Sequence, residues 1–121
     1  MANTFKVATF AAEPASAGTP YVMYTIAGCT TGVVLGLILT NIHTSAVTAE
    51  VELVSTTSNR SVANNTANGT SFLVKDVSIP AGSSLEILSG GKVVLETGDV
   101  LRIDCSVADK LSGTLSLMEI T

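Results

Sequence analysis

The sequence predicts an all-β protein, an antiparallel β-sandwich or jelly roll of about eight strands. In residues 46–54, AVTAEVELV, every second residue from Val47 to Leu53 is apolar and the residues between them are Thr or Glu, which is the two-residue period of a half-buried strand. The apolar stretches are short and are separated by Gly, Ser, Pro and Asp, as is typical of antiparallel all-β domains.

Nine stretches fit strands. The third of them, Val33–Thr44, is rich in Leu and β-branched residues on both faces, so we expect a central strand packed from two sides, or one face covered by a partner chain. In residues 100–107, VLRIDCSV, alternation places Cys105 on the core side. In chain order the expected strands are Thr4–Phe10, Tyr21–Ala27, Val33–Thr44, residues 46–54, Ser71–Ser78, Leu85–Leu88, Lys92–Glu96, residues 100–107 and Thr114–Ile120.

Turn chemistry separates the later strands. Pro80 with Gly82 and the isolated Gly113 predict turns, and the carboxylate of Asp99 is expected to accept backbone N–H bonds in another. Gly90–Gly91 lies between two short apolar runs and predicts a tight hairpin.

The chain is predicted to hold a flexible N-terminal arm, residues 1–20, and a single β-sandwich domain, residues 21–121. The connector AAEPASAGT, residues 11–19, would free the first strand to pair with a neighbouring subunit.

The polar loop Ser55–Thr70 is long enough to suggest either a tip that touches a partner or a simple hairpin extension. Its sequons are interpreted as products of a polar composition and not as glycosylation sites; they begin at Asn59, Asn64 and Asn68.

Charge and hydropathy argue against two classes of partner. Six basic and ten acidic residues give a net charge of −4, and the Lys and Arg residues are scattered singly, so no nucleic acid is expected. The N-terminus shows no export signal. The continuously nonpolar run Val33–Leu39 is far shorter than the roughly 20 residues of a membrane-spanning helix, so no membrane is expected either.

The residues that could carry catalysis or hold a metal are few and isolated. His43 is the single histidine, and no nucleophile motif accompanies it. Glu50 and Glu52 occupy the solvent side of an alternating strand. Cys29 and Cys105 lack metal-ligand spacing and are interpreted as reduced, buried thiols, with one disulfide as the alternative. We therefore expect no catalytic residue, no cofactor, no metal and no enzymatic activity.

Two resemblances bear on fold and function. The segments IPAGSSLEIL (79–88) and VVLETGDVLRI (93–103) resemble the paired turns of cupin-type jelly rolls, but the histidines that hold the cupin metal are missing, so this likeness is confined to strand architecture. Over Tyr21–Thr121, the order of an apolar strand region, a polar loop, FLVKDVSIPAG, ETGD and a closing SLMEIT resembles small virion structural proteins of tailed bacteriophages.

The phage resemblance implies a non-enzymatic particle component made in the host cytoplasm and located in the virion. A capsid decoration (cement) protein is expected, with a tail, neck or fibre-associated protein, or a carbohydrate- or receptor-binding module, as alternatives. Hydrophobic residues make up 46% of the chain and charged ones 13%, a balance that favours self-association. The expected partners are further copies of the chain, as a trimer, and the major capsid protein or other virion proteins. Candidate interface residues are Phe5, Phe10, Val33, Leu35, Leu37, Leu39, Phe72 and Val74.

Overall fold

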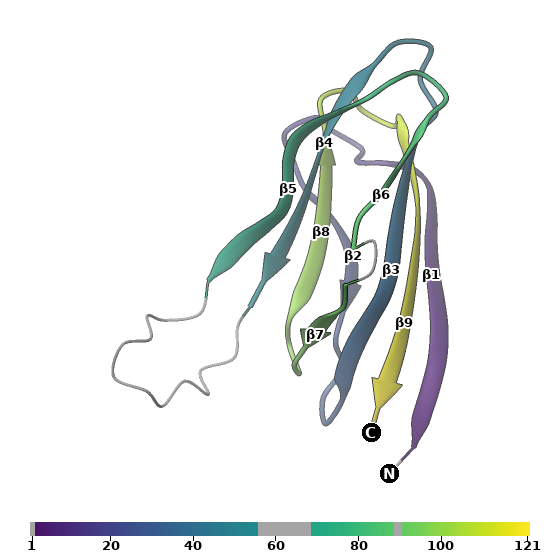
Figure 1. Ribbon diagram of the computed structural model, residues 1–121. Coiled ribbons are helices and arrows are strands. Elements are labelled where there is room, and N and C mark those ends of the chain that lie inside the picture. Colours follow the sequence, from purple (N-terminus) through teal and green to yellow (C-terminus); the bar gives the residue numbers. More distant parts are fainter. Residues whose placement is uncertain (1, 56–68, 89–90) are drawn as a thin grey trace.

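The computed structural model describes residues 2–55, 69–88 and 91–121. These residues form two antiparallel sheets packed face to face (Figure 1) and contain no helix. The all-β class is therefore as predicted, and each of the nine expected stretches overlaps a strand. The strands are β1 (Asn3–Glu13), β2 (Tyr21–Thr25), β3 (Thr31–Asn41), β4 (Val47–Val54), β5 (Thr70–Ile79), β6 (Ser84–Glu86), β7 (Val93–Leu95), β8 (Val100–Cys105) and β9 (Leu111–Ile120).

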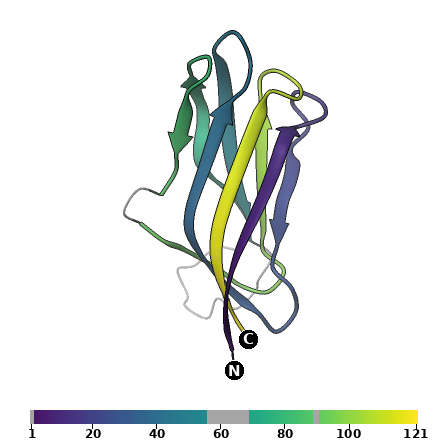
Figure 2. The ribbon, with the colours of Figure 1, turned by 90° about the vertical axis from the view of Figure 1, so that its right-hand side faces the viewer.

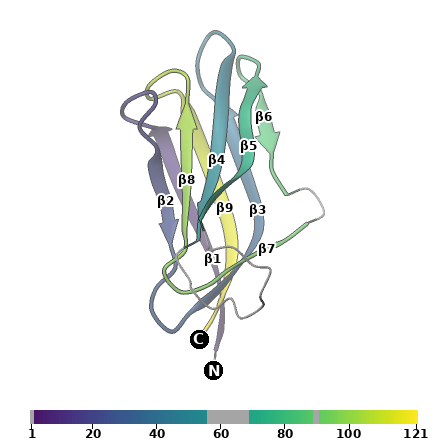
Figure 3. The same ribbon diagram turned by 90° about the vertical axis from the view of Figure 1, so that its left-hand side faces the viewer.

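The two sheets interleave strands from both halves of the chain. The five-stranded sheet has the order β1-β9-β3, and β3 also pairs with β6 and β7 (Figure 2). The four-stranded sheet has the order β2-β8-β4-β5 (Figure 3). All these pairings are antiparallel. The two last strands, β8 and β9, therefore lie inside the sheets and not at their edges.

The hairpin predicted at Gly90–Gly91 is not formed. β6 and β7 do not pair with each other; β6 pairs with residues 38–40 of β3, and β7 with residues 32–34. The two short strands thus run in the same direction, end to end along one neighbour. A hairpin would have given them opposite directions. Gly90 itself lies outside the described residues.

The segment expected to be a flexible arm contains a paired strand. β1 is hydrogen-bonded to β9 from Asn3 opposite Ile120 to Phe10 opposite Gly113. The ends meet as well, since the amides of Ala2 and Thr121 each donate to the carbonyl oxygen of the other, at 3.0 and 2.9 Å. The expectation of a free first strand is corrected for residues 3–13, because backbone pairing to β9 and the burial of Phe10 tie it to its own chain.

Gly113 lies within β9 and not in the turn that the sequence predicted. It is buried directly beneath the ring of Phe10, its partner across the β1–β9 ladder. A Cβ atom at position 113 would lie 2.5 Å from Phe10 Cζ and closer still to Cε1. The glycine is therefore required for a close approach, with an aromatic ring occupying the space above it. The Phe10 ring also meets Tyr21 edge to face, with ring centroids 5.3 Å apart, which ties β1 to the second sheet.

The core fills the space between the sheets and follows the predicted alternation along β8 and along β4 as far as Val51. Beyond Val51 the pairing of β4 with β5 shifts in register, Glu52 is buried and Leu53 is only partly buried. Val47, Ala49 and Val51 of β4 are at most 2% exposed, and Cys105 is buried as expected. Burial of such apolar side chains is the main stabilising contribution to a domain of this kind. The buried apolar residues are Phe10, Met23, Ile26, Val34, Leu37, Leu39, Val47, Ala49, Val51, Ile79, Ile87, Leu95, Leu101, Ile103, Cys105, Leu111, Leu115 and Leu117.

Asn41, at the end of β3, is a fully buried polar residue whose amide is satisfied on both sides. Its Nδ2 donates to the carbonyl oxygens of Ser45 and Ile79, both at 2.9 Å. Its Oδ1 accepts from the backbone amide of His43 at 2.7 Å. The side chain therefore fixes the turn after β3 and joins it to the end of β5, because a buried polar group is tolerated only when it is hydrogen-bonded.

Two of the predicted turns are confirmed. The Ser83 amide donates to the Pro80 carbonyl oxygen at 3.0 Å, and Gly82 between them has φ +70°. In the turn before β8, Asp99 Oδ2 accepts from the Glu96 amide at 3.0 Å, as expected for a turn aspartate. Both cysteines are free, but Cys29 is exposed, which corrects the prediction that both thiols are buried.

The part of the chain that the structure describes holds no helix of the length and apolarity needed to cross a membrane.

Candidate interaction surface

The residues considered above as candidates for catalysis or metal binding do not lie together in one site. His43 lies in the turn after β3 and is partly buried. Among the described residues, no three His, Cys, Asp or Glu side chains come together in a way that could hold a metal ion.

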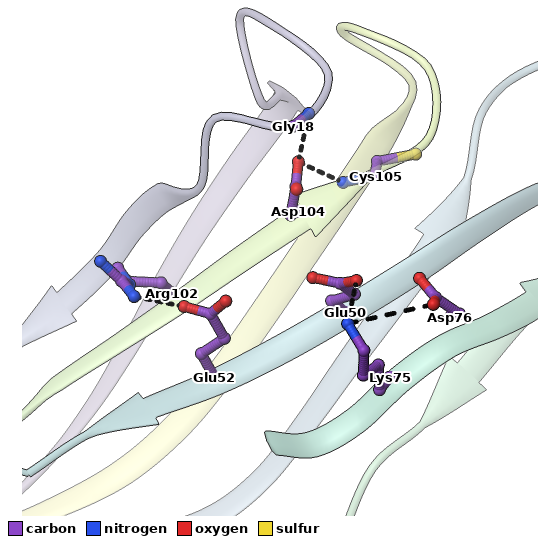
Figure 4. Close-up of polar contacts among 8 residues, drawn as sticks. All are labelled: Gly18, Glu50, Glu52, Lys75, Asp76, Arg102, Asp104 and Cys105. Atoms are coloured by element: carbon purple, nitrogen blue, oxygen red, sulfur yellow. Dashed lines mark hydrogen bonds and ion pairs between the residues drawn. The ribbon is translucent and has the colours of Figure 1, made fainter. Parts of the chain in front are cut away.

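A pocket of about 350 Å³ brings three carboxylates near one another, those of Glu50, Asp76 and Asp104. Each already has a partner within the chain (Figure 4). Asp104 Oδ1 accepts from the amides of Gly18 and Cys105, at 3.1 and 2.8 Å. Lys75 Nζ lies 3.1 Å from Glu50 Oε1 and 4.0 Å from Asp76 Oδ2. These contacts join the end of β8 to the connector after β1, and β5 to β4, so the charges that line the pocket are already engaged within the chain.

The outer face of the four-stranded sheet is charged and internally paired. Arg102 of β8 forms an ion pair with Glu52 of β4, a residue that is 8% exposed. On the next strand, β5, Lys75 pairs with Glu50 and lies over the ring of Phe72 at 4.4 Å from its centroid. Of the two glutamates predicted to face solvent, Glu50 is partly exposed, whereas Glu52 is buried, which corrects the prediction for that residue; both are held in cross-strand ion pairs. The hydrogen bond to Glu50 raises the pKa of Lys75, as an opposite charge at this distance should.

A polar cluster lies between the sheets near the chain ends. The Glu119 carboxylate accepts from the Tyr24 hydroxyl and pairs with Lys6 Nζ, both at 2.7 Å. The hydrogen bond from Lys6, reinforced by that from Tyr24, holds the pKa of Glu119 below its ordinary value of 4.5. Burial, with the bond to Glu119, raises the pKa of Tyr24. The three side chains come from β1, β9 and β2, so the cluster joins the edge of one sheet to the other.

The outward-facing residues of β1, β9, β3, β6 and β7 form what we call the apolar face. Their side chains alternate with buried ones, and none of them is buried. Apart from the large apolar members, they are Asn, Ser, Thr, Gly and a single charged residue, Glu86 at the β6 margin. The large apolar members are Phe5, Val7, Val33, Leu35, Ile38, Val94, Met118 and Ile120.

The exposed hydrophobic residues are concentrated on this face. Of the eight large hydrophobic residues that are exposed in the described chain, five belong to it: Phe5, Val7, Leu35, Ile38 and Val94. A concentration of exposed apolar side chains on one face is typical of an interaction site. The two outer faces of the molecule therefore differ sharply, one charged and paired, the other apolar and almost without charge.

The predicted interface residues divide into three groups. Phe5 is 73% exposed, Leu35 is 37% exposed and Val33 is partly exposed, and all three belong to the apolar face. Phe72 and Val74 lie on β5 of the other sheet, exposed and partly exposed respectively. Phe10, Leu37 and Leu39 are packed in the core, so the chain itself covers them.

Sequence reasoning missed Val7, Ile38, Val94, Met118 and Ile120. The signal was present in TFKVATF, where Phe5 and Phe10 are an odd number of residues apart and must face opposite sides of a regular strand. On β3 the alternation is interrupted by a bulge between Val34 and Gly36. That bulge places Leu35 outside while Leu37 and Leu39 are inside, and strict alternation could not have separated them.

Comparison with known protein families, with curated proteins and with solved structures finds no match.

Proposed function

We propose that the protein is a non-enzymatic structural component of a phage particle, in the first place a capsid decoration (cement) protein that self-associates and binds capsid subunits. The observation that carries the proposal is the apolar face, an exposed sheet surface on which Glu86 is the single charged residue. A protein that acts by covering and joining surfaces needs such a face, whereas an enzyme needs convergent reactive groups.

The strand order supports a jelly roll as the finer description of the fold. β6 and β7 share one position beside β3, so the nine strands occupy eight positions in two sheets of four. The resulting orders, β1-β9-β3-β6/β7 and β2-β8-β4-β5, are those of two interlocked Greek keys. Viral capsid domains are among the proteins built in this way, as are lectins and cupins. The topology agrees with the proposed role but does not select it, because one fold serves many functions.

The proposed action is adhesive. Subunits held to one another and to a shell at several sites gain affinity from effective concentration, without any strong single contact. The expected position is on the virion, with the major capsid protein or another virion protein as the partner. The outer face of the four-stranded sheet, where Lys75 is exposed and paired with Glu50, then offers a surface of different character for the second partner.

The proposal is tested on particles of the phage that encodes the chain. Immunogold electron microscopy with antibodies to the purified protein should label the shell, and mass spectrometry should find the chain in purified particles. Label confined to the neck, tail or fibres would favour the alternative virion roles. Absence from purified particles, combined with binding to a glycan array, would replace the proposal with a carbohydrate-binding module.

A further inference from the structure

One row of the apolar face crosses four neighbouring strands without a polar interruption. Phe5 of β1 is paired with Met118 of β9, Met118 with Val33 of β3, and Val33 with Val94 of β7. Directly paired residues lie on the same side of a sheet, about 5 Å apart. Phe5 and Val94, at the two ends of this row, are 73% and 60% exposed.

The face has the size of a protein interface. β3 and β9 have 11 and 10 residues, which corresponds to about 35 Å of strand at roughly 3.3 Å per residue. Four strand positions spaced by about 4.8 Å give a width of roughly 19 Å. The product is about 650 Å² before side-chain relief is counted, close to the roughly 800 Å² that each partner buries in a standard stable complex.

The lack of charge favours a second copy of the same chain as the occupant. When a face packs on itself about a twofold axis, the same patch is used by both subunits, so central charges would be opposed by charges of the same sign. The apolar face meets this requirement, because its one charged residue, Glu86, lies on the short margin strand β6. It offers no charged group on β1, β9 or β3 with which to select a charged partner.

The edge of the same sheet is less suited to self-association. β1 is the edge strand, and Lys6 points inward from it to Glu119, with its pKa raised by that contact. Inward-pointing charges on edge strands are a known protection against edge-to-edge pairing. Association across the face leaves this arrangement undisturbed, whereas adding a strand beside β1 would cover Lys6, which is 49% exposed.

We propose that the apolar face packs against the same face of a second copy of this chain, in a twofold-symmetric, sheet-on-sheet dimer. Sheets stacked in this way lie about 10 Å apart with their side chains interdigitated. The inference rests on the proposed function for its biological role and deepens it by naming the partner surface. It also replaces the trimer expected in the sequence analysis with a twofold unit.

The test is sedimentation velocity of the full chain over a concentration series. The wild-type protein should reach twice the 12.3 kDa chain mass. Phe5→Glu should raise the dimer dissociation constant at least about 100-fold, because each dimer would bury two unpaired carboxylates in apolar surroundings. Val94→Glu, at the other end of the row, should have a similar effect. The matched control is Phe72→Glu, an exposed aromatic on the other sheet, which should leave the constant within about threefold, since a surface change away from the interface has little effect.

Circular dichroism and urea unfolding establish that each variant is folded before its mass is interpreted. A wild-type chain that stays monomeric at all concentrations overturns the inference, as does a dimer that Phe72→Glu disrupts as much as Phe5→Glu does. A mass of three subunits also overturns it. The proposed function is judged separately. A folded monomer that still labels phage shells refutes the dimer alone, whereas a dimer sensitive to Phe5→Glu but absent from particles refutes the particle role alone.

Discussion

Replacing Gly113 by alanine is expected to destabilise the protein through one identifiable contact. The added Cβ would lie 2.5 Å from Phe10 Cζ, closer to Cε1 and 3.2 Å from Cδ1, so the ring must move. Phe10 is buried and packed edge-on against Tyr21, which leaves it little room. Forcing an extra carbon into such a core costs about 1–3 kcal/mol.

The size of the steric effect can be separated from the backbone effect of losing a glycine. Gly36→Ala is the matched control, because Gly36 lies in β3 of the same sheet and nothing is found within 4 Å of a Cβ built there. Neither glycine has a positive φ, so both substitutions should gain similarly, about 0.4–1 kcal/mol, from reducing the freedom of the unfolded chain. The difference between the two variants in unfolding free energy then measures the clash at position 113.

The assay is urea unfolding followed by circular dichroism, with Gly113→Ala also made in a Phe10→Leu background. Leucine lacks the Cε1 and Cζ atoms that the new Cβ would meet, so the cost of Gly113→Ala should fall by at least about 1 kcal/mol in that background, within the range seen for coupled neighbours. Equal unfolding free energies for Gly113→Ala and Gly36→Ala, or an undiminished cost in the leucine background, would refute the argument that the ring requires the glycine.

Three further predictions follow from polar and thiol groups. Glu119→Gln should destabilise the protein near neutral pH and do so less below pH 4.5. The pKa of Glu119 is lower in the folded protein than its unfolded value of 4.5, so its carboxylate stabilises the fold above pH 4.5, and this stability is lost as pH falls through the folded pKa. Urea unfolding over a pH series measures the difference. Asn41→Leu should cost roughly 3 kcal/mol in urea unfolding, because it removes the satisfied hydrogen bonds of a fully buried amide. A thiol reagent should modify only Cys29 in the native protein and also Cys105 after unfolding.

Each of these has a control that isolates its cause. Glu86→Gln, at an exposed carboxylate, should show little pH-dependent difference from wild type, and a loss like that of Glu119→Gln would remove the ion-pair explanation. Thr40→Ala, next to Asn41 but on the outer face, should change stability by less than about 0.5 kcal/mol. Cys29→Ser should abolish native thiol labelling; persistent labelling would mean that Cys105 is reached in the folded state.

The strands could be predicted from the alternation of apolar and polar residues within each segment. The alternation in residues 46–54 and 100–107 predicted both strands and the inward sides of Val47 to Val51 and of Leu101 to Cys105, since the period of two depends only on neighbouring residues. It failed at Glu52, which is buried where β4 shifts in register against β5. The turn roles of Pro80, Gly82 and Asp99 were equally local, because they depend on backbone torsions and short hydrogen bonds. The hairpin predicted at Gly90–Gly91 rested on the same local reasoning and was wrong. Both short strands pair with β3, which is distant in sequence, and the residues around the two glycines do not indicate that pairing.

The apolar face could be predicted only in part. The sequence identifies Phe5, Val33 and Leu35 as interface candidates, but it does not separate them from Phe10, Leu37 and Leu39, which are core residues. The phase of β1 and the bulge after Val34 decide which side each residue takes. The pairing of strands distant in sequence is what gathers Met118 and Val94 beside Val33, and no local pattern encodes that pairing.

The central position of β8 and β9 has a consequence for synthesis on the ribosome. β1 and β3 have no common neighbour until β9 has been made, and β2 and β4 have none until β8 has been made. A nascent chain that ends before Val100 therefore contains strands of both sheets but lacks the strand that joins β1 to β3 and the strand that joins β2 to β4. The edges that β8 and β9 would cover stay unpaired until those strands are made. A premature stop codon at or just before position 100 should accordingly yield a chain prone to aggregation or degradation, and not a smaller domain, because unpaired strand edges and incomplete cores are the usual origin of both.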